Sequence, residues 1–166
     1  VTRLGNDNWV MAYCQIAHDC QVGSKTIFAN GVQLAGHVHI GDWVILGGMT
    51  LVHQFVHVGA HAFTGMGSSL SQGVPPYVMA AGYPATPRGI NTEGLRRRGF
   101  AADEILAVRR AYKTLYREGR ALEDARHALE AAASESQPLS ALVEFLAVPG
   151  RGPRVDPDGT ARVLHR

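Results

Sequence analysis

The sequence of 166 residues has little cysteine, little charge and no long apolar run. Its two cysteines, Cys14 and Cys20, are too few for a disulfide framework and fit a reducing compartment. Charged residues make up 18% of the chain, which argues against a coiled coil, and a hydrophobic fraction of 46% argues against a disordered protein. No segment approaches the roughly 18 to 20 consecutive apolar residues of a membrane-spanning helix. We therefore expect one folded domain, or one domain with a small appendage, and no membrane span.

The charge balance gives no reason to expect a nucleic-acid partner. Sixteen Lys and Arg residues against fourteen Asp and Glu residues leave a net charge of only +2. The N-terminus also lacks the basic segment followed by an apolar one that marks a signal peptide. The chain begins at Val1, not Met, and inside a repeating pattern. We therefore expect it to be the later part of a longer protein.

The few charges are distributed unevenly. Residues 1–87 contain five charged side chains, whereas residues 101–166 contain twenty, ten of each sign, among Leu, Ala and Glu. A passage rich in Pro and Gly, residues 73–89, joins the two parts. The sequence therefore predicts two regions that are built differently.

The first region has a period of six residues. Steps of six from Leu4 reach twelve positions, of which eleven are apolar and only Thr64 departs. The residue that follows is Gly, Ala or Ser in ten of the twelve cases. A helix with a period of 3.6 residues cannot keep this phase. The pattern predicts a parallel β-helix of hexapeptide repeats, in which Cys14 and Cys20 occupy small inward positions and fill the core.

Four motifs carry a resemblance to a known family: residues 16–20 (IAHDC), 34–38 (LAGHV), 52–55 (VHQF) and 91–100 (NTEGLRRRGF). The hexapeptide repeat resembles the left-handed β-helix acyltransferases, and these motifs are similar to UDP-N-acetylglucosamine (UDP-GlcNAc) O-acyltransferases. The resemblance covers roughly residues 1–147. Family members have several further coils at the N-terminus. The last motif is specific to this enzyme, not to the fold.

The resemblance implies a left-handed parallel β-helix followed by a C-terminal α-helical domain. We expect the β-helix over 1–73, a Pro/Gly loop with a nucleotide-contacting segment over 74–99, the helical domain over 100–149 and a disordered tail over 150–166. It also implies a homotrimer in the bacterial cytoplasm, with active sites between neighbouring prisms. The implied reaction is the first step of lipid A biosynthesis, in which a 3-hydroxyacyl chain passes from acyl carrier protein to UDP-GlcNAc.

The histidines of the repeat fall into register. If three hexads complete a coil, as the resemblance implies, residues 18 apart stack. His18 and Gln54 then share one register position, His37 lies one residue after it, and His53 lies one residue before it. Three imidazoles and a carboxamide are therefore expected on one edge of the prism.

Histidine suits a general base, because its unperturbed pKa lies near neutral pH. The resemblance implies that His18 is this base and removes the proton from the 3-hydroxyl of GlcNAc, with Asp19 as its electrostatic partner. That pairing requires a turn, since neighbouring residues on a regular strand point to opposite faces. The backbone N–H of Gly36 is expected to stabilise the oxyanion.

The resemblance further implies that His37 and Gln54 hold the sugar and the acyl carbonyl, with His53 in the same cleft. No cofactor and no metal are expected. Three alternatives stay open: the related N-acyltransferase of the same pathway, a zinc hydratase like the γ-class carbonic anhydrases, and a folded but inactive chain with too few coils.

The motif at 91–100 is expected to bind the nucleotide. Asn91 and Glu93 can hydrogen-bond a uracil edge, and Arg97 or Arg98 can donate two hydrogen bonds to the diphosphate. The resemblance assigns Asn91, Glu93 and Arg97 to this task, and we add Arg98. A run of charges such as this one can also be a solvated face.

A helical pattern begins near Phe100. An apolar stripe recurs at helical spacing, over Ile105, Val108, Tyr112 and Leu115. Arg109 and Arg110 lie on the other side, where two roles are open: they keep the surface soluble, or they dock the acidic acyl carrier protein. Two further helices are expected near 121–134 and 138–147.

Met66 is a candidate for setting acyl-chain length. A residue at the matching place in the family forms the floor of the acyl groove, and a glycine there leaves the groove longer. Met66 therefore favours a shorter donor; the alternative is an exposed Met on a turn.

Overall fold

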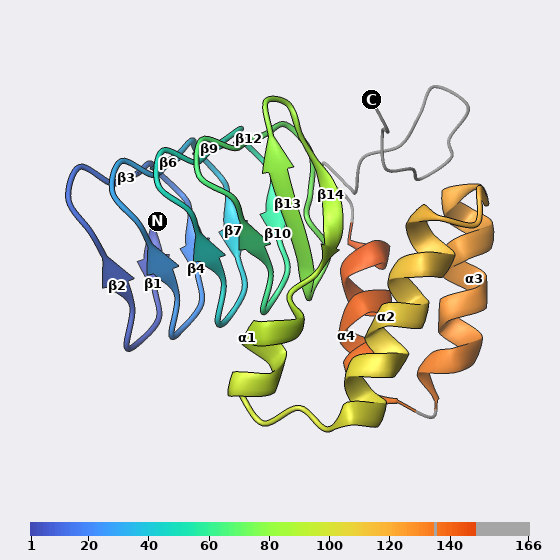
Figure 1. The fold of residues 1–166 in the computed structure, drawn as a ribbon. Helices are drawn as coiled ribbons and strands as arrows, with labels where there is room; N and C mark the ends of the chain where they lie inside the picture. Colours follow the sequence, from blue (N-terminus) through green and yellow to red (C-terminus); the bar gives the residue numbers. More distant parts are fainter. Residues whose placement is uncertain (135, 149–166) are drawn as a thin grey trace.

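The computed structural model describes residues 1–134 and 136–148. Its first half consists of two-residue strands that recur every six residues (Figure 1). These strands are β1 (Arg3–Leu4), β2 (Trp9–Val10), β3 (Gln15–Ile16), β4 (Gln21–Val22), β5 (Ile27–Phe28), β6 (Gln33–Leu34), β7 (His39–Ile40), β8 (Ile45–Leu46), β9 (Leu51–Val52), β10 (His57–Val58), β11 (Phe63–Thr64) and β12 (Ser69–Leu70). The period of six predicted from the sequence is confirmed.

Every third strand joins the same parallel sheet. The three sheets run β1-β4-β7-β10, β2-β5-β8-β11 and β3-β6-β9-β12, and each strand pairs with the one that begins 18 residues later. Gln21, for example, pairs with His39, which pairs with His57. Twelve strands at three per coil make a parallel β-solenoid of about four turns. The expected stacking of residues 18 apart is therefore confirmed.

The core of the solenoid is a column of inward side chains. The second residue of most strands is buried, as are the small residues two positions before it; the largest of them include Phe28, Leu34, Leu46, Val32, Val38 and Val44. Cys20 is buried and Cys14 is partly buried, and each Sγ lies 3.1 Å from a backbone carbonyl oxygen of the next coil. Both thiols are free and fill the core, as predicted.

Thr64, the exception in the apolar column, is buried against Thr50. The two hydroxyl groups lie 2.9 Å apart, and Thr64 Oγ1 accepts a hydrogen bond from the Gly47 N–H at 3.1 Å. The Thr50 hydroxyl donates to the Gly47 carbonyl at 2.6 Å. Since both hydroxyl groups of the pair have hydrogen-bond partners, the core tolerates Thr64 at a position where the repeat otherwise has an apolar residue.

Three edges run along the solenoid, where the chain turns from one sheet to the next. The histidine edge comprises turns 17–20, 35–38 and 53–56; the tryptophan edge comprises 24–25, 42–43 and 60–61; the methionine edge comprises 12–13, 30–31, 48–49 and 66–67. Each turn has a residue with positive φ, and most of these are not glycine. The side chains at these positions are thereby displayed in columns on the outside of the prism.

The solenoid is closed by a hairpin. Strand β13 (Val78–Gly82) pairs in parallel with β11 and antiparallel with β14 (Ala85–Ile90), where the sequence predicted a loop. Pro87 is compatible with this strand because β14 lies at the edge of its sheet. The hairpin therefore gives the last coil a partner before the chain leaves the solenoid.

Four helices follow, beside the closed end of the solenoid (Figure 1). They are α1 (Thr92–Arg97), α2 (Ala102–Tyr116), α3 (Leu122–Ala133) and α4 (Gln137–Ala147). The predicted stripe on α2 is buried: Ile105, Val108, Tyr112 and Leu115. None of the helices in the described part of the chain is long and apolar enough to cross a bilayer. The expected tail, 150–166, lies outside the described residues.

Candidate active site

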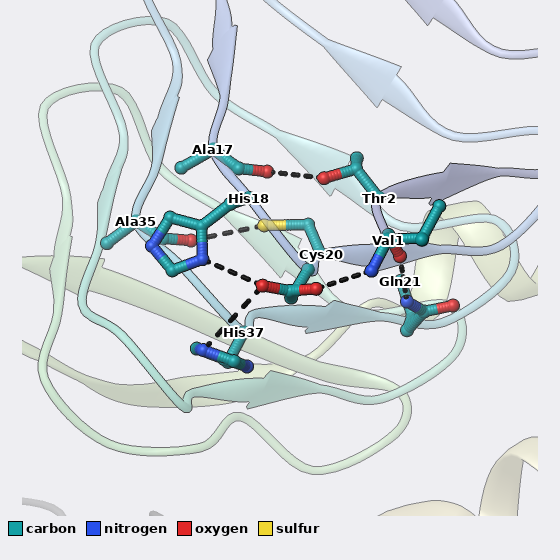
Figure 2. A network of polar contacts seen from close by, with 9 residues as sticks. Val1, Thr2, Ala17, His18, Cys20, Gln21, Ala35 and His37 are labelled. Atoms are coloured by element: carbon teal, nitrogen blue, oxygen red, sulfur yellow. Dashed lines mark hydrogen bonds and ion pairs between the residues drawn. The ribbon is translucent and has the colours of Figure 1, made fainter.

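His18 and Asp19 form a hydrogen-bonded pair on the histidine edge. The chain turns directly after β3, and Asp19 has a φ of 57°. This turn brings the two neighbouring side chains to the same side, so that His18 Nδ1 lies 2.9 Å from Asp19 Oδ2 (Figure 2). The turn that the pairing required is therefore present. An imidazole bonded through Nδ1 to a carboxylate leaves Nε2 free to accept a proton.

The Asp19 carboxylate is surrounded by positive or protonatable groups. His37 Nε2 lies 3.9 Å from its Oδ2, and His18 Nδ1 is hydrogen-bonded to the same oxygen. The hydrogen bond with His18 and the charge of nearby His37 lower the pKa of Asp19. Asp19 is therefore a carboxylate at neutral pH.

His37 stands between His18 and an aromatic ring that sequence reasoning missed. Its ring meets His18 edge-on, with centroids 5.1 Å apart, and stacks on Phe55 at 4.8 Å with an interplanar angle of 12°. Phe55 lies 18 residues after His37, so the register could have identified it. It was overlooked because only polar side chains were considered. Phe55 limits the orientations open to His37.

Gly36 lies against the imidazole of His18. A Cβ built on Gly36 would be 2.6 Å from His18 Cε1 and 2.7 Å from Nε2, closer than real Cβ atoms approach. The Gly36 N–H donates no hydrogen bond to any of the described residues. The absence of a side chain thus lets a reacting group approach both a free N–H and an imidazole.

His53 and Gln54 occupy the next coil of the same edge, as the register predicted. Gln54 aligns with Gly36 and His18, and the Phe55 N–H donates to the Gly36 carbonyl at 3.2 Å. His53 Nδ1 lies 3.2 Å from the Gln54 carbonyl. Within the described residues, the His53 side chain makes no hydrogen bond or ring contact with the His18–His37 pair. It borders the cluster without joining it.

The cluster could hold a metal ion. One donor atom each from His18, Asp19 and His37 lie within 4.8 Å of one another. Two imidazoles and a carboxylate are a common ligand set for divalent transition metals. The third donor is Asp19, whereas the zinc hydratase alternative expected three histidines.

The first helix after the solenoid is held by Asn91. This residue is buried; its Oδ1 accepts from the Gly94 N–H at 3.1 Å, and its Nδ2 donates to the His61 carbonyl at 3.0 Å. Its side chain therefore caps α1 and fixes it to the tryptophan edge. On the exposed face of α1, Arg97 Nε donates to Glu93 Oε1 at 3.1 Å.

Among the residues that the structure describes, Arg98 differs from its neighbours Arg96 and Arg97 in having no carboxylate partner. No ion pair among residues 1–134 and 136–148 includes it. Its Nη1 lies 3.2 Å from His61 Nδ1, and its guanidinium lies 5.2 Å from the centre of the Trp43 ring. Burial lowers the pKa of Arg98. The group is a partly buried cation that an anion could neutralise.

A cavity of about 430 Å³ lies beside Arg98, between the tryptophan edge and the helices. Its walls include His61, Tyr77, Phe100 and Glu104. Sequence reasoning did not select His61, because the repeat gives no sign that residues 37 positions apart would meet.

The remaining predicted residues lie apart from the His18 cluster. Met66 is on the methionine edge with 84% of its surface exposed. Arg109 and Arg110 are exposed on α2. One copy of the chain therefore displays the histidine cluster, Arg98 and Met66 on three different edges.

Comparison with known proteins gives matches over most of the chain. Residues 74–153 match the family model described as UDP-N-acetylglucosamine O-acyltransferase, domain 2, and residues 2–36 match that of the bacterial transferase hexapeptide of six repeats. The chain is 56% identical to a protein of Janthinobacterium sp. (strain Marseille) and 55% identical to one of Thiobacillus denitrificans, both named acyl-[acyl-carrier-protein]--UDP-N-acetylglucosamine O-acyltransferase. These alignments cover 92% of this chain but 60% and 59% of those proteins. The chain thus spans about three fifths of the length of these relatives.

Solved structures agree with this likeness. The UDP-N-acetylglucosamine acyltransferase of Francisella novicida superposes with a TM-score of 0.90 at 42% identity, over 94% of this chain and 57% of that one. The UDP-N-acetylglucosamine acyltransferase of Arabidopsis gives a TM-score of 0.80 at 41% identity, over 85% and 51%. The expected fold, a left-handed β-helix followed by helices, is confirmed.

Proposed function

The chain belongs to the UDP-N-acetylglucosamine O-acyltransferase family, and we propose that it transfers a 3-hydroxyacyl chain from acyl carrier protein to the 3-hydroxyl of UDP-GlcNAc, the first step of lipid A biosynthesis. The observation that carries this proposal is the geometry around His18. Its imidazole is hydrogen-bonded to Asp19 on one side and lies against Gly36 on the other, and the Gly36 N–H donates no hydrogen bond within the described residues. A base and an oxyanion donor are what acyl transfer to a hydroxyl requires.

The reaction proceeds in two steps. In the first, His18 Nε2 takes the proton of the sugar 3-hydroxyl as that oxygen attacks the thioester carbonyl, and the Gly36 N–H stabilises the oxyanion. Asp19 stabilises the imidazolium that forms. In the second, the carbon–sulfur bond breaks, the imidazolium returns its proton to the leaving thiolate, and the ester is released. The base, its carboxylate partner and the N–H donor belong to the chain, and the hydroxyl and the thioester belong to the two substrates.

Residues around the base hold the acceptor and the acyl group. His37 and Gln54 bind the sugar and the acyl carbonyl, with His53 at the margin of the cleft. The support for His37 is its fixed ring, held between His18 and Phe55. A fixed ring loses little freedom when it binds a sugar hydroxyl.

The nucleotide is bound by the segment around α1. Arg98, as the cation without a carboxylate partner in the described chain, binds the diphosphate. Glu93 and Arg97 lie on the exposed face and contact the uridine. Asn91 acts by fixing α1, since both polar atoms of its buried side chain are engaged within the chain.

Binding both parts of the substrate requires more than one copy of the chain. His18 and Arg98 lie at different edges of the prism, so a single UDP-GlcNAc molecule reaches both groups when the edges of two copies face each other. A homotrimer provides such an arrangement three times over. The donor, acyl carrier protein, docks on Arg109 and Arg110 of α2. We propose the bacterial cytoplasm as the compartment of the reaction.

The other activities have less support. The relatives reported above carry the O-acyltransferase name, which favours this reaction over N-acyl transfer by the related enzyme of the pathway. The same names argue against zinc-dependent hydration, although His18, Asp19 and His37 lie close enough to bind a metal.

Replacement of His18 by Ala tests the proposal. We expect the purified protein to acylate UDP-GlcNAc from a 3-hydroxyacyl carrier protein, and His18→Ala to lower kcat at least about a hundredfold while UDP-GlcNAc binding persists. The control is His127→Ala, which removes an exposed imidazole from α3. Retained turnover in His18→Ala would reject the mechanism. Transfer only to a glucosamine amine, or zinc-dependent hydration of CO₂, would support one of the two alternatives.

A further inference from the structure

The ring of His61 is clamped in an aromatic column on the tryptophan edge. It stacks on Trp43, with centroids 6.2 Å apart at an angle of 10°, and on Tyr77, with centroids 5.8 Å apart at 22°. Phe100 meets it edge-on at 5.0 Å. An imidazole held on three sides has a fixed plane, so its nitrogen atoms point in defined directions.

The hydrogen bond with Arg98 fixes the tautomer of this imidazole. A guanidinium can only donate, so the 3.2 Å contact of Arg98 Nη1 with His61 Nδ1 requires Nδ1 to be unprotonated. The proton of the neutral ring is then on Nε2. Burial, and next the charge of Arg98, lower the pKa of His61 to about 4, while Asp42 acts in the opposite direction. The ring therefore remains an acceptor at neutral pH.

His61 also holds the N-terminal end of α1, through its backbone. The His61 carbonyl accepts the hydrogen bond from Asn91, whose side chain caps the N-terminus of the helix. Arg98 is the C-cap residue. His61 thus holds one end of α1 through its backbone and the other through its ring.

From these contacts we infer that His61 is a positioning residue for the nucleotide: its Nδ1 lone pair and the face of Trp43 hold the Arg98 guanidinium ready for a phosphate. This inference rests on the proposed function, in which Arg98 binds the diphosphate. Preorganisation of this kind strengthens binding because the arginine side chain loses less freedom when the ligand arrives. Because His61 acts through Arg98, its replacement should change the affinity for UDP-sugars. The chemical step at His18, on another edge, should be unchanged.

Two substitutions test the hydrogen-bond acceptor of His61 and its aromatic ring separately. His61→Asn keeps an acceptor, the amide Oδ1, close to the position of Nδ1, whereas His61→Phe keeps the stacked ring without an acceptor. Both suit the left-handed turn, since Asn tolerates positive φ and Phe55 occupies the equivalent type of position with a φ of 63°. The control is His127→Phe on the exposed face of α3.

The experiment is calorimetric titration with UDP and with UDP-GlcNAc. We expect His61→Phe to weaken binding about tenfold and to leave kcat at saturating substrate within about twofold, and His61→Asn to bind within about threefold of the unsubstituted protein. In the Arg98→Met background, His61→Phe should have no further effect, because its effect passes through Arg98. Additive losses, or equal binding by the unsubstituted protein and His61→Phe, would overturn the inference. Failure of the unsubstituted protein to bind UDP-GlcNAc would instead contradict the proposed function.

A measurement on the unsubstituted protein does not depend on the folding of a variant. The ¹⁵N shifts of the His61 ring should report an unprotonated Nδ1 and a protonated Nε2 at neutral pH. The opposite tautomer would show that Nδ1 does not accept from Arg98, and would overturn the inference.

Discussion

Gly36 and His18 lie so close that a Cβ on Gly36 would be 2.6 Å from Cε1 of the imidazole. The backbone of one coil thereby sets how near the proposed base, His18, can come to the proposed oxyanion donor, the Gly36 N–H. His18 is itself exposed, with a side-chain exposure of 72%, and it also contacts the Asp19 carboxylate and the His37 ring.

Gly36→Ala should therefore displace the His18 ring and lower kcat about a hundredfold, while the exposed imidazole moves aside at little cost in stability, within about 1 kcal/mol. Steady-state kinetics and thermal unfolding measure the two effects. Gly48→Ala is the matched control, because its Cβ would meet nothing closer than the Asn30 carbonyl at 3.4 Å. A Gly36→Ala enzyme as active as the Gly48→Ala enzyme would show that the close approach has no catalytic role.

Met66→Gly should shift donor preference toward longer acyl chains. The Met66 side chain is almost wholly exposed on the methionine edge, so its removal should lengthen the proposed acyl groove without disturbing the core. The measurement is the ratio of kcat/KM for a longer and a shorter 3-hydroxyacyl carrier protein. Met49→Gly, the same change one coil earlier on the same edge, should leave the ratio unchanged. An unchanged ratio in Met66→Gly would remove this residue from the acyl site.

Arg109→Glu should raise KM for the acyl carrier protein about tenfold at low salt and leave KM for UDP-GlcNAc unchanged. Arg109 is exposed on α2, and reversal of its charge weakens attraction to an acidic partner. Added salt should reduce the difference, because it screens exposed charges. The control is Arg120→Glu, which makes the same change in net charge but lies in the segment after α2. If both substitutions raise KM alike, the effect is one of net charge and not of a docking surface.

Acid should destabilise the fold through His61. An unfolded imidazole takes up its proton near pH 6.5, whereas the folded one does so only near pH 4. The unfolded state therefore binds more protons between these values, and stability falls as pH is lowered through this window. His61→Asn removes the titrating group, so it should lose less stability between about pH 7 and pH 5 in urea denaturation. An equal loss in both proteins would mean that His61 does not contribute to the pH dependence.

The sequence was sufficient for the solenoid and for the residues of the histidine edge. The period of six is a property of the chain itself, and the register of 18 was implied by the family resemblance, so His18, Gly36 and Gln54 could be aligned without coordinates. The hydrogen bond between His18 and Asp19 could not be derived in the same way, because it depends on a positive φ at Asp19.

The contacts at the tryptophan edge could not be predicted from the sequence. Arg98 meets His61 and Trp43 only because the hairpin and α1 lead the chain back along the solenoid, and this path has no repeat. The buried position of Asn91 could not be predicted either, since a buried cap and an exposed ligand have the same sequence signature. Phe55 was within reach of the register, but its packing on His37 is an aromatic contact that no polar motif marks.

The pairing of each strand with the one 18 residues further on constrains how this chain can change length. Loss of a single residue inside a strand would turn every later side chain of that coil from the interior toward water, whereas loss of a whole coil would leave all surviving neighbours matched. Natural variants of different length should accordingly differ by complete coils or by loops at the edges, and engineered shortening should proceed in the same units.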